Sequence, residues 1–141
     1  MPTKDDRRAF EEAIENKNQD QIRAFLQRDD AKELLLMKDE YGYLLIHDAC
    51  LFGLDTTCLQ LILDAAVEHG IIKKMLETKD NLYGRTCLYY ACYWKLSFDS
   101  LRLLLEYVSK YADIKMILEE KDHNDWTHLH NACFNDLPTD S

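Results

Sequence analysis

Histidine and cysteine are the side chains of this 141-residue chain best suited to chemistry, because both are preferred ligands of Zn²⁺. The candidate ligands are His47, His130, Cys50, Cys92 and Cys133, and each of these cysteines belongs to an Ala-Cys pair that recurs after 41 or 42 residues. If the pairs mark stacked units, equivalent positions lie about 8–10 Å apart, too far for zinc–sulfur bonds of about 2.3 Å. A disulfide also needs Cα atoms within about 7 Å. We therefore expect no metal, and we interpret these cysteines as small buried side chains between helices.

A cysteine hydrolase is the other chemistry that these residue types allow. It needs a nucleophile, a base and an orienting group in one place, and Cys87 with His128 or His130 is the best pair in the chain. No glycine-rich oxyanion loop accompanies that pair, and the sequence contains no P-loop, dinucleotide fingerprint or EF-hand loop. We therefore predict that the chain is not an enzyme and that it binds no cofactor or small-molecule substrate.

The charge balance narrows the class of partner. The chain has 17 basic and 26 acidic residues, for a formal net charge of −9. An acidic chain repels phosphate backbones and anionic membranes unless it carries a local basic patch, and no such patch is visible in the sequence. The sequence therefore predicts neither nucleic-acid nor membrane binding, and it favours a partner protein with a basic surface.

The cysteine count and the apolar runs indicate the compartment. Five cysteines without a C-x-x-C pair do not form a disulfide framework, which favours a reducing environment. The N-terminus has no signal-peptide pattern, and apolar runs such as Leu34 to Met37 are far shorter than the roughly 20 residues of a membrane span. We expect a cytoplasmic protein; for a protein exported by a pathogen, the compartment would be the host cytosol.

An internal repeat organises the sequence. The dipeptide Lys-Asp occurs at 38–39, 79–80 and 121–122, and an Ala-Cys pair follows each time. Leu35, Leu76 and Leu118 each precede one of these lysines by three residues. So many matches at one period indicate structural units that stack side by side.

Each unit is predicted to contain three helical segments and a polar corner. A short apolar segment comes first, at 44–52, 86–94 and 127–134. A longer helix follows at 56–68 and 98–111, where apolar residues recur at i, i+3 and i+4. A third short segment lies at 71–78 and 113–120, and 30–37 is its counterpart before the first corner. The corners are 38–43, 79–85 and 121–126, and residues 7–29 are expected to form a helix pair of their own.

The corners and short segments resemble the ankyrin repeat, whose first helix carries the pattern D-x-x-G-x-T-P-L-H-x-A. Asp39, Gly42, His47 and Ala49 match its Asp, Gly, His and Ala positions. Residues 84–91 match Gly, Thr, Leu and Ala, and residues 125–132 match Thr, Leu, His and Ala. The resemblance implies an all-α fold, an ankyrin-like α-solenoid of stacked helix pairs with short projecting hairpins. It also implies that His47 and His130 make hydrogen bonds near the start of their helices.

The sequence departs from the ankyrin pattern in three ways. No unit has the proline, Tyr89 replaces a histidine, and the period is 41–42 residues rather than about 33. The excess falls near the third short segment, which we interpret as an extra short helix in each repeat. A period of this length also fits HEAT or armadillo units, which remain the structural alternative.

The repeat predicts one domain over residues 1–141 with four parts. These are an N-terminal capping repeat (1–38), two repeats (39–79 and 80–121) and a truncated repeat (122–141). Because the last part lacks its long helix, we expect the chain to be a fragment of a longer array.

The positions that face ligands in the ankyrin family are heavily aromatic here, although only 11% of the chain is aromatic. Tyrosine and tryptophan dominate interface hot spots. Arg85 among them could receive a carboxylate or a phosphorylated side chain. The mapped positions are Tyr41, Tyr43, Leu51, Phe52, Tyr83, Arg85, Tyr93, Trp94, Asn124, Trp126, Phe134 and Asn135.

We therefore expect a non-enzymatic scaffold that binds a partner protein through a concave, aromatic-rich surface of hairpins and first helices. Packing of the same aromatics within the array is the alternative for these side chains. The alternative function is a targeting or substrate-recruiting arm of a larger enzyme or pathogen effector, with its catalytic domain beyond residue 141.

Overall fold

The computed structural model describes residues 2–94 and 96–119. Within these ranges every regular element is an α-helix, which confirms the predicted all-α class. The predicted segment 122–141 lies outside the described residues. The helices are α1 (Lys4–Glu15), α2 (Gln19–Leu26), α3 (Ala31–Leu36), α4 (Leu45–Leu51), α5 (Thr56–Glu68), α6 (Ile72–Glu77), α7 (Cys87–Tyr93), α8 (Phe98–Tyr111) and α9 (Ile114–Glu119).

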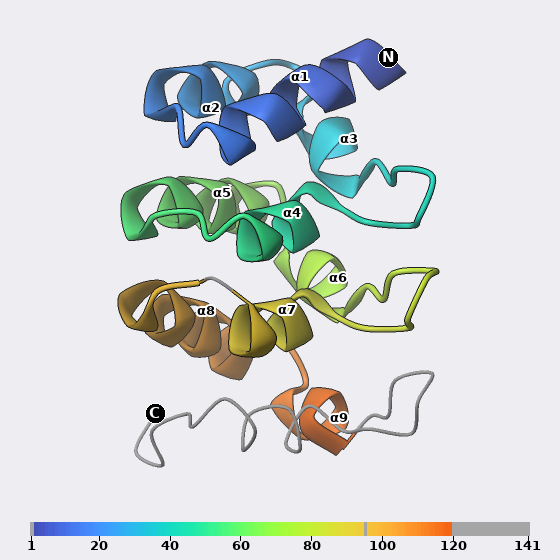
Figure 1. The fold of residues 1–141 in the computed structure, drawn as a ribbon, viewed down its shortest axis with the longest axis vertical. Coiled ribbons are helices and arrows are strands. Elements are labelled where there is room, and N and C mark those ends of the chain that lie inside the picture. Colours follow the sequence, from blue (N-terminus) through green and yellow to red (C-terminus); the bar gives the residue numbers. More distant parts are fainter. Residues whose placement is uncertain (1, 95, 120–141) are drawn as a thin grey trace.

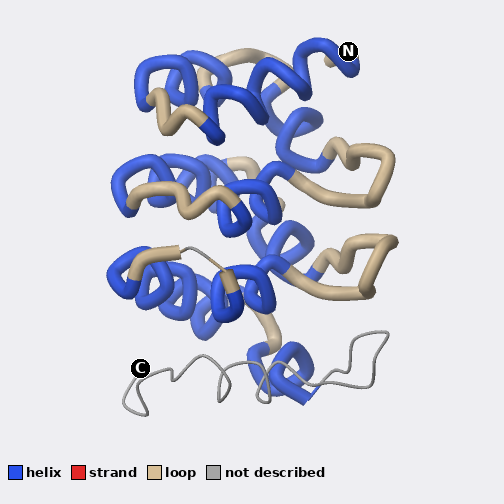
Figure 2. Tube along the Cα trace, in the orientation of Figure 1, coloured by secondary structure: helices blue, strands red, loops and turns tan. Residues whose placement is uncertain are grey.

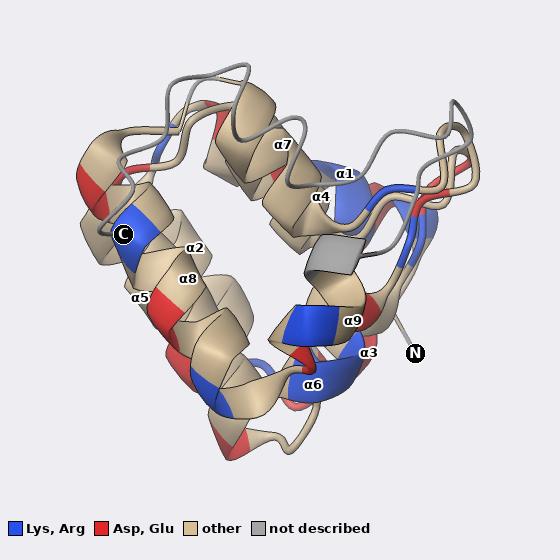
Figure 3. Cartoon of the chain, turned by 90° about the horizontal axis from the view of Figure 1, so that it is seen from below, with Lys and Arg blue, Asp and Glu red and all other residues tan. Residues whose placement is uncertain are grey.

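The helices form three layers of three consecutive helices each, stacked along one axis (Figure 1). Seen along that axis, corresponding helices lie over one another in columns (Figure 3). The first column contains α1, α4 and α7, the second α2, α5 and α8, and the third α3, α6 and α9. One cluster of buried apolar side chains runs through all three layers, so each layer is stabilised by its neighbours.

The long helices of the second column follow the sequence pattern closely. Asp55 and Ser97 cap α5 and α8, each accepting a backbone N–H of the first turn with its side chain. Leu59, Ile62 and Leu63 then bury one face of α5. The predicted helices 56–68 and 98–111 therefore begin and end where the structure has them.

The third column consists of the short helices that the long repeat period predicted. Leu34 and Leu35 of α3 are fully buried, and Met75 and Leu76 occupy the same place in α6. Ile117 of α9 is buried in the same way. These helices close the core against solvent on the side that the first two columns leave open (Figure 3).

The two described corners, 38–43 and 79–85, project beyond the helices as loops on one side of the stack (Figure 2). Each of these two corners is organised by the aspartate of a Lys-Asp pair. The carboxylate of Asp39 accepts the backbone N–H groups of Tyr41 and Tyr43, both at 2.9 Å. The carboxylate of Asp80 accepts the backbone N–H of Tyr83 at 2.6 Å. The repeated aspartate therefore fixes the shape of the corner.

The second corner is one residue longer than the first. The N–H of Asp39 donates to the carbonyl of Tyr43 at 3.0 Å, whereas the N–H of Asp80 donates to the carbonyl of Arg85 at 2.9 Å. This extra residue explains why the first two Lys-Asp pairs are 41 residues apart and the first two Ala-Cys pairs 42.

Among the described residues, no helix combines the length and apolar character needed to cross a membrane.

Candidate functional site

Five side chains stack one upon another from the second corner to the end of α7, and we call them the aromatic ladder: Tyr83, Arg85, Tyr89, Tyr93 and Trp94. The guanidinium carbon of Arg85 lies 4.6 Å from the ring centroid of Tyr83 and 3.9 Å from that of Tyr89. Tyr89 stacks on Tyr93 with centroids 5.4 Å apart and ring planes 11° apart. Tyr93 in turn stacks on Trp94, at 5.8 Å and 24°. Because Tyr89 and Tyr93 are four residues apart in α7, they share one face of the helix.

The ladder is buried at its centre and exposed towards both ends. Tyr89 is only 5% exposed, whereas Tyr83 is 40%, Tyr93 42% and Trp94 51% exposed. Trp94 is the most exposed large apolar side chain in the described part of the chain. The ladder therefore exposes aromatic surface towards its two ends, while Tyr89 at its centre is held in the core.

The residues predicted to contact a partner fall into three groups. Four have substantial exposed surface: Tyr41 (48%), Tyr83, Tyr93 and Trp94. Four are half-buried: Tyr43, Leu51 and Phe52, which pack against the core, and Arg85, which lies in the ladder. Four lie outside the described residues: Asn124, Trp126, Phe134 and Asn135. The partner-binding role of this set stays a prediction, and the exposed aromatics are the members with surface to offer.

A buried polar network joins Asp80 of the second corner to Tyr90 of α7, which contacts the ladder residue Tyr89 edge-on. Asp80 is 3% exposed, and its carboxylate accepts the hydroxyl of Tyr90 at 2.5 Å. The hydroxyl of Tyr43, from the preceding corner, lies 3.3 Å from that of Tyr90. Burial, reinforced by the hydrogen bond to Asp80, raises the pKa of Tyr90 far above its ordinary value, so the phenol remains protonated. Sequence reasoning missed Asp80 and Tyr90 as a pair, although the repeated Lys-Asp dipeptide was a signal for the aspartate.

His47 is fully buried in the first turn of α4. Its Nδ1 accepts the backbone N–H of Leu44 at 2.9 Å, which confirms the expected hydrogen bond near the helix start. Its Nε2 has no hydrogen-bond partner among the described residues. Burial lowers the pKa of His47 to about 4, although Asp80 opposes the shift. At neutral pH the ring is therefore uncharged and holds the backbone in place.

We expect the substitution His47→Asn to remove an acid sensitivity of folding. The pKa of His47 is about 4 in the folded protein and 6.5 as a reference value, so the unfolded chain binds the proton more readily between these values. Stability from the neutral ring is complete above about pH 6.5 and is lost as the pH falls towards 4, by up to about 3 kcal/mol. Asparagine retains an acceptor near the position of Nδ1 but does not titrate.

Urea unfolding of both proteins between pH 7 and pH 4.5 tests this expectation. The stability advantage of the wild type over the variant should shrink by about 2 kcal/mol or more across this range. Burial also raises the pKa of the neighbouring Asp48 to about 7, which has the opposite pH dependence, but Asp48 is present in both proteins and cancels. A constant difference would contradict a buried, neutral imidazole.

Arg7 of α1 ties the first layer to the second. The residue is only 4% exposed, and its guanidinium lies 2.7 Å from the carboxylate of Glu11 and 2.9 Å from that of Asp48. It also donates to the backbone carbonyls of Met37 at 3.2 Å and Tyr43 at 2.9 Å. Every polar partner except Glu11 belongs to a distant part of the chain, so the guanidinium joins α1 to the first corner and α4.

The acidic side chains around Arg7 resemble a cation site by distance alone. Carboxylate oxygens of Glu11, Asp39 and Asp48 lie within 4.8 Å of one another. The guanidinium of Arg7 contacts all three, at 3.9 Å in the case of Asp39, and supplies one positive charge among the three acidic side chains. We therefore interpret this group as a partly buried ion-pair cluster.

The described cysteines are Cys50, Cys58, Cys87 and Cys92, and all four are buried and free of disulfides. This agrees with the interpretation of Cys50 and Cys92 as buried side chains between helices. Burial raises the pKa of Cys92 to about 12, and a hydrogen bond to Cys87 together with burial raises that of Cys50 well above its ordinary value. The thiolate, which is the nucleophilic and metal-binding form, is disfavoured at both positions. Cys133, His128 and His130 lie outside the described residues.

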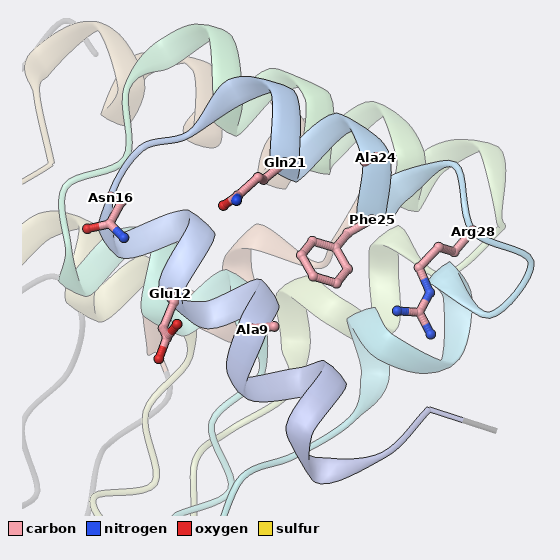
Figure 4. Close-up of a pocket in the computed structure, with 7 residues that line it drawn as sticks. All are labelled: Ala9, Glu12, Asn16, Gln21, Ala24, Phe25 and Arg28. Atoms are coloured by element: carbon pink, nitrogen blue, oxygen red, sulfur yellow. The ribbon is translucent and has the colours of Figure 1, made fainter.

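A groove of about 500 Å³ opens between α1 and α2 in the first layer, two layers away from the ladder (Figure 4). The ring of Phe25 stacks on Phe10 there, with centroids 4.8 Å apart. The guanidinium of Arg28 is already paired with Asp30 at 2.8 Å and with Asp6 at 3.3 Å. The cation of the lining is therefore already paired. It consists of Ala9, Glu12, Asn16, Gln21, Ala24, Phe25 and Arg28.

The described fold and surface define an all-helical protein of stacked layers with an exposed aromatic ladder beside projecting loops. No family model matches the sequence, and no curated protein matches it either.

Proposed function

We propose that this chain is a non-enzymatic protein–protein interaction scaffold, built as an ankyrin-like α-solenoid. The observation that carries the proposal is the aromatic ladder, in which Tyr83, Tyr93 and Trp94 are 40–51% exposed while Tyr89 anchors the stack in the core. Exposed tyrosine and tryptophan side chains supply large contact areas at a low cost in conformational entropy.

The shape of the corners supports the ankyrin-like solenoid over the HEAT or armadillo alternative. Residues 38–43 and 79–85 leave the helical stack as projecting loops, whereas HEAT units would turn there as plain helix corners (Figure 2). The loops and the first column of helices would together form the concave surface expected for the family. The short helices α3, α6 and α9 would be the extra element in each repeat.

Rigidity between layers supports a binding role. The backbone N–H of Asn81 in the second corner donates to the carbonyl of Tyr41 in the first at 2.8 Å. On the opposite side of the layer, the hydroxyls of Thr56 and Ser100 lie 2.9 Å apart, and Ser100 also donates to the carbonyl of Leu54 at 3.2 Å. A surface fixed in this way loses little conformational freedom when a partner binds.

The buried, free thiols and the negative charge support two further parts of the proposal. Cysteines kept as thiols are typical of a reducing compartment such as the cytoplasm. A net charge of −9 favours a partner with a basic surface, because complementary charges accelerate encounter and disfavour acidic competitors.

Affinity capture with quantitative mass spectrometry tests the function. Replacing Tyr93, Trp94 and Trp126 by alanine should reduce recovery of the specific partner at least about ten-fold, because such residues act as hot spots. The matched control replaces Phe98 and Met116, which are 42% and 41% exposed but lie outside the ladder, and should leave recovery unchanged. Circular dichroism must show the same helicity in all proteins. Equal recovery with both sets of substitutions would contradict the proposed surface.

A further inference from the structure

Four aromatic rings on the surface are covered by cations from the chain itself. Arg28 lies over Phe25 with its guanidinium carbon 5.8 Å from the ring centroid, and Arg102 lies over Phe98 at 4.9 Å. The ammonium nitrogen of Lys110 lies 5.2 Å from the ring centroid of Tyr111. In the ladder, Arg85 lies over Tyr83 at 4.6 Å. At four separate places on its surface, the protein therefore pairs an aromatic ring with a positive charge of its own.

Trp94 has no such partner among the described residues. One face of its indole stacks on Tyr93, and the side chain is still 51% exposed, so the other face is open to solvent. Trp94 is the end of a nearly parallel stack, because the ring planes of Tyr89, Tyr93 and Trp94 change by only 11° and then 24°. A planar group can extend such a stack.

We propose that the open face of Trp94 binds an arginine side chain within a basic segment of the partner protein, an inference that rests on the proposed function. Arginine fits for three reasons. Its guanidinium is planar and weakly hydrated, so it stacks on an indole better than a lysine ammonium does. The ladder already contains a guanidinium, that of Arg85, 3.9 Å from the ring centroid of Tyr89. The net charge of −9 attracts a basic segment and repels an acidic one.

Three fluorescein-labelled hexapeptides of alternating glycine and a second residue test this inference. The second residue is arginine, its uncharged isostere citrulline, or lysine, and binding is followed by fluorescence anisotropy at low and at physiological salt. The arginine peptide should bind several-fold more tightly than the lysine peptide, and the citrulline peptide most weakly. Arginine binding should also weaken as salt is added.

Variants locate the site. Trp94→Ala should weaken binding of the arginine peptide about five-fold or more, whereas Phe98→Ala, which removes an exposed ring already covered by Arg102, should leave it unchanged. In a Trp126→Phe background, Trp94 is the only tryptophan, and its emission should be quenched at several-fold lower concentrations of the arginine peptide than of the lysine peptide.

Several results would overturn the inference. These are equal binding of the arginine and citrulline peptides, unchanged affinity in Trp94→Ala, or no binding at low salt. A fourth hexapeptide, with glutamate as the second residue, and sedimentation experiments test two other occupants of the face. Tighter binding of the glutamate peptide, or self-association through Trp94, would assign the face to a different occupant and would equally refute the inference. If these peptides fail while capture of the partner still depends on Tyr93 and Trp94, the proposed function stands and only the arginine is wrong. If both fail, the surface itself is wrong.

Discussion

Replacing Arg7 by alanine should lower the free energy of unfolding by about 3–5 kcal/mol. At pH 8, above the pKa of about 7 that Asp48 has beside Arg7, the substitution leaves the carboxylate of Asp48, which is 5% exposed, buried without its cation. It also removes the donor to the carbonyl of Met37, and a largely buried acceptor left unpaired costs about 1–3 kcal/mol. The carbonyl of Tyr43 loses one of two donors and keeps the backbone N–H of Asp39. These partners lie 30 to 41 residues away in the sequence, so the loss separates α1 from the second layer.

Two further variants separate the ion pair from other effects. Arg8→Ala removes the same charge from an exposed position on the same helix and should change the free energy of unfolding by no more than about 0.5 kcal/mol. The double variant Arg7→Met with Asp48→Leu replaces both charges by apolar groups and should recover most of the loss, because a buried ion pair roughly balances its own desolvation. Urea denaturation followed by circular dichroism measures all three. A loss in Arg7→Ala no larger than that in Arg8→Ala would contradict the role of the buried pair.

The second and third columns were predictable from the sequence because they depend on local signals. Helix α5 begins after a capping aspartate, and its apolar residues recur with helical periodicity, so its bounds follow from residues close in the chain. The third short helix followed from the length of the repeat. The repeat period of this chain exceeds the family average of about 33 residues. A short helix is a compact way for the additional residues to bury apolar side chains such as Met75 and Leu76.

Arg7 and Tyr90 were not predictable, because their roles depend on partners far away in the sequence. Arg7 lies among charged residues at the start of α1, where a solvated position is the ordinary expectation. Its burial arises only when α4 brings Asp48 against α1. Tyr90 is similar, since its hydroxyl is satisfied by Asp80 from the corner and lies near Tyr43 from the layer before. No periodicity in the sequence encodes these contacts.

Four of the five residues of the ladder were mapped from the sequence as candidate partner contacts, but the exposure of the mapped residues was not predictable. Tyr41 and Tyr43 lie on either side of one glycine and have the same side chain, yet the first is 48% exposed and the second packs against the core. The difference arises because Tyr90 of the next layer meets Tyr43 edge-on at 5.7 Å. The ladder also depends on the stacking of Tyr89 on Tyr93. Tyr89 is not among the positions mapped from the ankyrin family, so the mapping did not predict this contact.

Gly42→Ala should lower the free energy of unfolding by about 3 kcal/mol, for two separable reasons. Gly42 has φ = +79°, a left-handed conformation that costs a residue with a Cβ roughly 1–2 kcal/mol. A Cβ there would also lie 2.6–2.8 Å from atoms of Asn81, including its backbone nitrogen at 2.7 Å. A backbone atom cannot move aside as the end of a flexible side chain can, so the two corners would have to separate, at a cost of about 1–3 kcal/mol. That separation would break the 2.8 Å hydrogen bond from Asn81 to the carbonyl of Tyr41.

Gly70→Ala is the matched control, because it has the same backbone strain without the clash. Gly70 has φ = +71°, and no atom lies within 4 Å of a Cβ built on it, so its substitution should cost only about 1–2 kcal/mol. The difference between the two variants in urea denaturation therefore measures the contact between successive corners. That contact fixes the corner that carries Tyr83 at the start of the ladder relative to the layer before it. Equal losses at the two glycines would mean that the corners are not held together, and the aromatic surface would then lack the rigidity on which its proposed binding role depends.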